Sequence, residues 1–248
     1  MLKINNLNLI LNNTHILKNI NLEVKKNKIT AIIGKNASGK SSIIKCINGI
    51  YKYDGEILFE GKNINDIKIK EKSKKISILP QILKYPHILV SDLLLIGLNP
   101  SLSIYEKIKE NDVIKINEIF KKFKIEHLQN KYLDELSGGQ RQVVYLAMQL
   151  IQNAELMIFD EPSSFMDINY ENQLLRVISD LKILNKTVLV VMHNINNIIK
   201  CADHIVIVDE GEVVFAGNKN ECLEEKIIEK VFNLKRYEFE DHIIFENN

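Results

Sequence analysis

The sequence predicts an α/β protein with a layered core, a β-rich N-terminal part and a helical insertion. Three patterns lead to this class. Apolar and polar residues alternate in short runs over 2–33, apolar residues follow helical spacing over 82–135, and apolar strands alternate with helices after 156. Continuously apolar strands separated by helices are typical of a parallel sheet covered on both faces.

The individual elements follow from apolar runs and from the turn residues that separate them. Asn12–Asn13 and the polar run 25–28 divide the first strands, and Pro80 ends a later one. Glu210–Gly211 joins two short apolar runs as a hairpin turn. The expected strands lie within 2–33, 54–64, 74–79, 156–160, 187–192, 205–209 and 213–216. The expected helices run from the glycine loop to about 49, through parts of 82–135, over about 169–184, after 194 and, as an acidic helix, after 217.

Composition excludes several classes of protein. The 248 residues, 46% of them hydrophobic, are enough for one large domain. The net charge of +1, with three arginines in all, argues against a nucleic-acid partner. The N-terminal segment lacks the unbroken apolar run of a signal peptide, and no run approaches the roughly 20 residues that span a bilayer. Any membrane role is therefore expected to come through a partner. Three widely spaced cysteines fit reduced, mostly buried thiols.

Residues 34–42 read GKNASGKSS and satisfy the pattern G-x-x-x-x-G-K-[ST] between a predicted strand and a predicted helix. Gly34 and Gly39 let backbone N–H groups surround an anion, and the helix N-terminus adds its dipole. Lys40 can reach the β and γ phosphates, and the Ser41 hydroxyl can bind Mg²⁺. The alternative is a glycine turn with an incidental lysine. The context favours a phosphate-binding loop.

Two further motifs supply the rest of a nucleotide site. Residues 156–161 read LMIFDE, so a buried strand ends in Asp160, which can hold Mg²⁺, and Glu161 can act as a general base. Residues 136–140 read LSGGQ, in which Ser137 and Gln140 form a capping box. Capping does not explain two glycines in a first helical turn, where they lower helix stability. They are understandable if backbone must approach a ligand closely.

Lys40, Ser137 and Asp160, in this order, make the chain resemble the nucleotide-binding subunit of ATP-binding-cassette (ABC) transporters over essentially its whole length. The resemblance implies a P-loop NTPase with a RecA-like α/β core, an N-terminal antiparallel β subdomain and an α-helical subdomain. It also implies one ABC ATPase domain over 1–248, with 1–81 and 156–248 as core and β subdomain, and about 82–155 as helical subdomain with the signature motif.

The resemblance assigns roles to further residues. Gln81 matches the glutamine that contacts Mg²⁺ and water, Asp167 matches the aspartate of the dimer interface, and His193 matches the histidine at the γ-phosphate. Leu11 stands where the family usually stacks an aromatic ring on adenine, so apolar contact remains and stacking is lost. Lys35 and Ala37 stand where proline and glycine are common. The implied ATP-binding residues are Leu11, Gly34, Lys35, Asn36, Ala37, Ser38, Gly39, Lys40, Ser41, Ser42, Ser137, Gly138, Gly139, Gln140 and Asp167. The implied Mg²⁺ ligands are Ser41, Gln81 and Asp160, and the implied catalytic residues are Glu161, His193 and Gln81.

The family's mechanism implies a homodimer in which each ATP lies between 34–42 of one copy and 137–140 of the other. It implies permease subunits in the membrane, an extracytoplasmic substrate-binding protein and a place on the cytoplasmic face of the membrane. Residues 192–203 and the C-terminal stretch look like those of importer ATPases for iron-siderophore, haem and cobalamin. The alternatives are an ABC ATPase for another metal or small solute, and a non-transport ABC protein that uses ATP as a dimer clamp.

Overall fold

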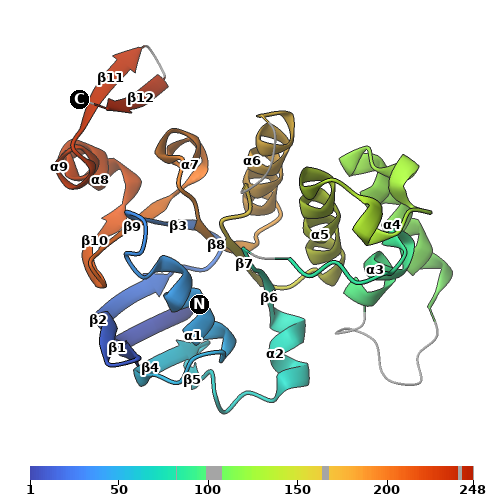
Figure 1. Ribbon diagram of the computed structural model, residues 1–248, viewed down its shortest axis with the longest axis horizontal. Coiled ribbons are helices and arrows are strands. Elements are labelled where there is room, and N and C mark those ends of the chain that lie inside the picture. Colours follow the sequence, from blue (N-terminus) through green and yellow to red (C-terminus); the bar gives the residue numbers. More distant parts are fainter. Residues whose placement is uncertain (82, 99–107, 164–167, 240–241, 248) are drawn as a thin grey trace. The chain divides into compact units, whose positions relative to one another are not determined.

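The computed structural model in Figure 1 describes residues 1–81, 83–98, 108–163, 168–239 and 242–247. The chain divides into two compact units. The first comprises Met1–Ile67 with Val177–Asn248, and the second comprises Lys68–Arg176. The predicted helical residues 82–155 fall in the second unit, and the exact subdomain boundaries stay a prediction.

The first unit contains an antiparallel sheet in the order β2-β1-β4-β5. Its strands are β1 (Leu2–Leu11), β2 (Thr14–Val24), β4 (Asp54–Phe59) and β5 (Lys62–Asn63). Asn12 and Asn13 have φ of 48° and 60°, the left-handed conformation that a two-residue hairpin turn requires. Asparagine adopts it more readily than most residues, so the predicted break at this point is confirmed.

Four other strands of the first unit follow in the order β10-β9-β3-β8. They are β3 (Ile29–Ile33), β8 (Thr187–Val191), β9 (His204–Asp209) and β10 (Glu212–Asn218). β3 is parallel to both of its neighbours, and all residues of β3 and β8 are buried. This confirms the parallel strands and the hairpin expected from the apolar runs. β3 leads into the glycine loop and then into helix α1 (Lys40–Asn48).

The C-terminal part of the first unit contains one element that the sequence did not predict. Helices α7 (Ile195–Cys201), α8 (Lys219–Glu224) and α9 (Ile227–Phe232) are followed by a hairpin of β11 (Leu234–Phe239) and β12 (His242–Asn247), drawn in red in Figure 1. The Asn196 side chain of α7 donates to Phe245 O at 3.0 Å and accepts from Phe245 N at 2.7 Å. A side-chain amide therefore completes the backbone hydrogen bonds of β12 at this residue.

The second unit is mostly helical. It holds two parallel strands, β6 (Ile76–Leu79) and β7 (Leu156–Asp160), with helices α2 (Ile69–Lys75), α3 (Val90–Gly97), α4 (Glu110–Phe123) and α5 (Gly138–Gln152). Two 3₁₀ turns, Glu126–Leu128 and Leu133–Glu135, lie between α4 and α5, and α6 (Ile168–Ile183) begins in this unit. α3 and α5 pack closely where Gly97 of α3 meets Met148 of α5. A Cβ at Gly97 would lie 2.9 Å from Met148 O, so a larger residue would not fit there without a shift.

The strand predicted over 74–79 was wrong at its start. Lys74 and Lys75 belong to the last turn of α2, and the strand begins at Ile76. α2 has no buried residue, and its last turn carries three lysines, which interact favourably with the negative end of the helix dipole. The three cysteines have free thiols, with Cys46 and Cys222 buried and Cys201 half-buried, as expected.

Candidate nucleotide-binding site

The glycine loop between β3 and α1 has the backbone of an anion-binding nest. Ala37 and Gly39 have φ of 61° and 104°, so two left-handed residues flank Ser38, a backbone pattern of the kind that forms anion-binding nests. Gly39 is the N-cap of α1 and supplies no side-chain oxygen to the first turn. Because no N-cap side chain bonds to the first turn, the positive N-terminal end of α1 is suited to binding an anionic ligand.

Lys40 is the buried one of the two lysines in this loop, with 4% of its surface exposed. Its ammonium group donates to Gly34 O at 2.9 Å and to Lys35 O at 2.7 Å, so the side chain folds back over the loop. The buried Ser38 Oγ makes no hydrogen bond to any residue that the structure describes. A buried cation, a buried hydroxyl and a left-handed backbone fit the phosphates of a nucleotide.

The remaining loop residues lie around this centre. Lys35, Asn36 and Ala37 are exposed at the tip, and Ser41 and Ser42 are half-buried in the first turn of α1. Leu11 is half-buried at the end of β1, where it pairs with Thr14. These positions agree with a loop that is open to ligand at its tip and held by packing at its base.

In the second unit, β7 ends at the buried Asp160, and the buried Glu161 follows directly after the strand. Asp160 is 4% exposed and Glu161 is 7% exposed. Glu161 has φ of 49°, which is uncommon for a residue that is not glycine and which recurs at functional sites. The Gln81 side chain donates a hydrogen bond to Glu161 Oε2, so two predicted site residues 80 positions apart meet. This contact could not be read from the sequence.

The LSGGQ segment opens α5 as a capping box, as predicted. Ser137 Oγ accepts from Gln140 N at 3.3 Å, and Gln140 Oε1 accepts from Ser137 N at 3.0 Å. Ser137 is exposed, and its hydroxyl proton is not used in either bond, so it can still donate to a ligand. Gly138 and Gly139 form the first turn of this helix.

His193 follows β8 in the first unit and is exposed. Its neighbour Asn194 is the N-cap of α7 and accepts from Asn197 N at 3.2 Å, which fixes the chain direction directly after the histidine. Asp167 lies outside the described residues. The roles assigned to all of these residues stay predictions.

Sequence reasoning missed two residues that contact the phosphate loop. Gly211 N–H donates to Ser38 O at 3.1 Å, and Asp209 forms an ion pair with Lys35 at 3.4 Å. The only available signal was the Glu210–Gly211 turn, which indicates a hairpin but not what the hairpin contacts.

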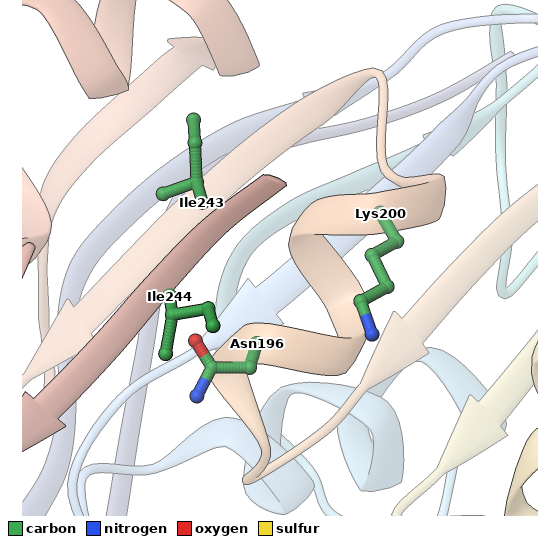
Figure 2. Close-up of a pocket in the computed structure, with 4 residues that line it drawn as sticks. All are labelled: Asn196, Lys200, Ile243 and Ile244. Carbon is green, nitrogen blue, oxygen red and sulfur yellow. The ribbon is translucent and has the colours of Figure 1, made fainter. Parts of the chain in front are cut away.

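A hollow of about 320 Å³ lies away from the predicted site residues, and Figure 2 shows the four side chains that line it. Asn196 and Lys200 of α7 and Ile243 and Ile244 of β12 line it. Its position follows from the packing of the C-terminal hairpin on α7.

The fold and the phosphate loop define a nucleotide-binding α/β protein of the P-loop class. The profile of the ABC transporter family matches residues 17–164, so the chain belongs to this family. It is an ATP-binding, ATP-hydrolysing subunit of an ABC transporter. None of the helices in the described ranges is both long enough and apolar enough to cross a membrane.

Three similar proteins illustrate the relationship. The petrobactin import ATP-binding protein YclP of Bacillus subtilis is 32% identical over 222 residues, covering 88% of this chain and 87% of that protein. The ferric enterobactin transport ATP-binding protein FepC of Escherichia coli is 29% identical over 223 residues, covering 89% and 82%. The ADP- and phosphate-bound dimeric structure of the cassette MJ0796 has a TM-score of 0.76 at 25% identity, covering 88% and 99%.

Proposed function

We propose that this subunit hydrolyses ATP to drive the import of a ferric siderophore through a membrane permease. The proposal rests on the sequence similarity of this chain to subunits named for petrobactin import and ferric enterobactin transport. These names favour a siderophore over haem or cobalamin. The identity of the siderophore would be set by the permease and by an extracytoplasmic binding protein, with this subunit on the cytoplasmic face of the membrane.

In the proposed site, residues 34–42 hold the phosphates of ATP, and Leu11 contacts the adenine. Ser137–Gln140 and Asp167 of a second copy complete the site, which is supported by the dimeric form of the similar cassette MJ0796. Mg²⁺ would be held by oxygen atoms of Ser41, Asp160 and Gln81, a donor type that suits this ion. It would neutralise charge on the β and γ phosphates.

The proposed chemistry is in-line attack of water on the γ-phosphate. Glu161 accepts the proton of this water, and its burial beside the Gln81 amide supports that role, because the carboxylate is held in one orientation. His193 would donate to the γ-phosphate. Removing the general base is expected to lower turnover on the order of 10² to 10⁴-fold.

The experiment is to purify the subunit with its co-purifying permease, reconstitute the complex in liposomes and measure phosphate release. Ferric siderophore with its binding protein should stimulate release, and Glu161→Gln should abolish the stimulated rate. A complex that hydrolyses ATP without response to any siderophore would refute siderophore import. Undiminished turnover in Glu161→Gln would refute the role of Glu161. A subunit that binds ATP and dimerises but co-purifies with no membrane permease would favour the clamp alternative.

A further inference from the structure

We infer that the turn between β9 and β10 is a positioning element of the phosphate loop, with Gly211 as its central residue. Gly211 N–H donates to Ser38 O in the loop at 3.1 Å. Gly211 O accepts from Lys18 N in β2 at 2.8 Å. A single residue therefore joins the phosphate loop to the antiparallel sheet through both of its backbone polar groups.

Gly211 has no room for a side chain. A Cβ at this position would lie 2.4 Å from Ile16 O, which is backbone of β2 and cannot move away as the end of a flexible side chain could. The phosphate loop also packs on β2 and on the turn. A Cβ at Gly39 would lie 2.6 Å from Leu17 Cδ2 and 3.9 Å from Gly211 Cα. β2, the turn and the end of the loop are thus in close contact.

The beginning of the loop rests on the same hairpin. A Cβ at Gly34 would lie 2.2 Å from Val208 O, so the two backbones touch. Lys35 Nζ and Asp209 Oδ2 form an ion pair at 3.4 Å, with the lysine side chain 55% exposed. Such an exposed pair contributes little energy, and the backbone contacts are the stronger restraint. Both ends of the loop are therefore held by residues 208–211.

The consequence concerns the orientation of the N–H groups that would face phosphate. A side chain at Gly211 must displace either the turn or β2, and the displaced turn moves Ser38 O and, with it, Gly39 at the start of α1. Anion binding by a nest depends on N–H groups that converge on one point. Gly211 contacts the loop and not the reacting atoms, so it is a positioning residue. The inference rests on ATP binding at this loop.

The chain contains a matched control in a second Glu–Gly turn. Glu60 and Gly61 join β4 to β5 with φ of 51° and 80°, and Glu210 and Gly211 have φ of 46° and 82°. Apart from its two chain neighbours, no atom of the described residues lies within 4 Å of a Cβ built at Gly61. Asparagine adopts this left-handed conformation readily, as Asn12 and Asn13 do. Gly→Asn at the two positions thus meets the same backbone requirement and differs in the space available.

The experiment compares wild type, Gly211→Asn and Gly61→Asn by calorimetric titration of the full chain with Mg²⁺ and ATP, and by steady-state hydrolysis. We expect Gly211→Asn to raise the Kd and the KM for ATP about tenfold, with kcat within about twofold of wild type, and Gly61→Asn to change none of them by more than about twofold. Equal affinities in the two variants would overturn the inference. Failure of the wild type to bind ATP would instead overturn the assignment of ATP to the loop.

A second measurement needs no variant and covers the case in which Gly211→Asn does not fold. Hydrogen exchange of the wild-type chain is followed by mass spectrometry with and without Mg²⁺ and ATP. Exchange should slow in the peptide that covers 207–213 and stay unchanged in the peptide that covers 58–64. Exchange at 207–213 that does not respond to ATP would contradict the inference.

Discussion

Replacing Asp203 by asparagine should destabilise the protein at neutral pH and leave little effect in acid. The Asp203 carboxylate accepts from Ile29 N at 3.0 Å, where β3 begins, and from Lys182 Nζ at 2.6 Å. Lys28 Nζ lies 3.9 Å away. Burial acts to raise the pKa of Asp203, but these hydrogen bonds and neighbouring charges outweigh it and hold the pKa below its ordinary value.

The expected loss in the free energy of unfolding follows from the groups that bond to the Asp203 carboxylate. A hydrogen bond from a backbone N–H to a carboxylate contributes about 1.5–3 kcal/mol, and a neutral amide oxygen about 1 kcal/mol. The Lys182 side chain is 44% exposed, so that ion pair adds at most about 1 kcal/mol. We therefore expect Asp203→Asn to lower the free energy of unfolding by about 1–2 kcal/mol at pH 7. Asp203→Ala, which removes the acceptor of Ile29 N–H, should lower it by about 2–3 kcal/mol.

The pH dependence has a definite sign. Because the pKa of Asp203 is lower in the folded chain, its stabilisation is present above the ordinary value of about 3.9 and is lost as pH falls through the folded value. Urea unfolding at pH 7, 5.5, 4 and 3 measures this, with Lys182→Met as a control that keeps the bond to Ile29 N–H. The free energies of unfolding of wild type and Asp203→Asn should differ at pH 7 and converge at pH 3. An equal difference at both pH values, or no difference at pH 7, would refute the reasoning.

Three further predictions test other parts of the structure. Ala37→Gly should raise the urea midpoint, with about 0.5 kcal/mol gained because alanine is strained at φ 61°, and an unchanged or lower midpoint would contradict this. Asn196→Ala should speed hydrogen exchange of Phe245 N–H about tenfold, since its acceptor is removed, and unchanged exchange would show that β12 is held by other contacts. Burial raises the pKa of Cys46 to about 12, so iodoacetamide at pH 8 should leave Cys46 unmodified until the chain unfolds, and rapid labelling of the native protein would disagree.

Local chemistry made part of this fold predictable. Ser137 and Gln140 cap α5 through bonds between residues three apart, which a short sequence window contains. β3 and β7 are short apolar runs ended by a glycine loop and by an acidic pair, so both their existence and their ends follow from the sequence. The order of these motifs then indicated the class of protein.

Other features depend on contacts that no local pattern contains. β11 and β12 mix charged and apolar residues without clear alternation, and the tie from Asn196 to Phe245 spans 49 positions. The contact of Gln81 with Glu161 and the left-handed backbone of Glu161 are likewise set by the folded chain. Gly211 looks like any hairpin glycine, and its importance lies in the closeness of Ile16 O and Ser38 O.

In the proposed mechanism, ATP is held between two copies of the subunit, and each copy presents the N-terminus of its α5 to the nucleotide bound by the other. The most direct measurement is the molar mass of the Glu161→Gln variant by light scattering, with Mg²⁺–ATP and with Mg²⁺–ADP. We expect dimers with ATP and monomers with ADP. Adding Ser137→Asp, which keeps a capping oxygen but repels phosphate, should abolish the ATP-dependent dimer. An ATP-loaded Glu161→Gln variant that stays monomeric even with its permease present would contradict the claim.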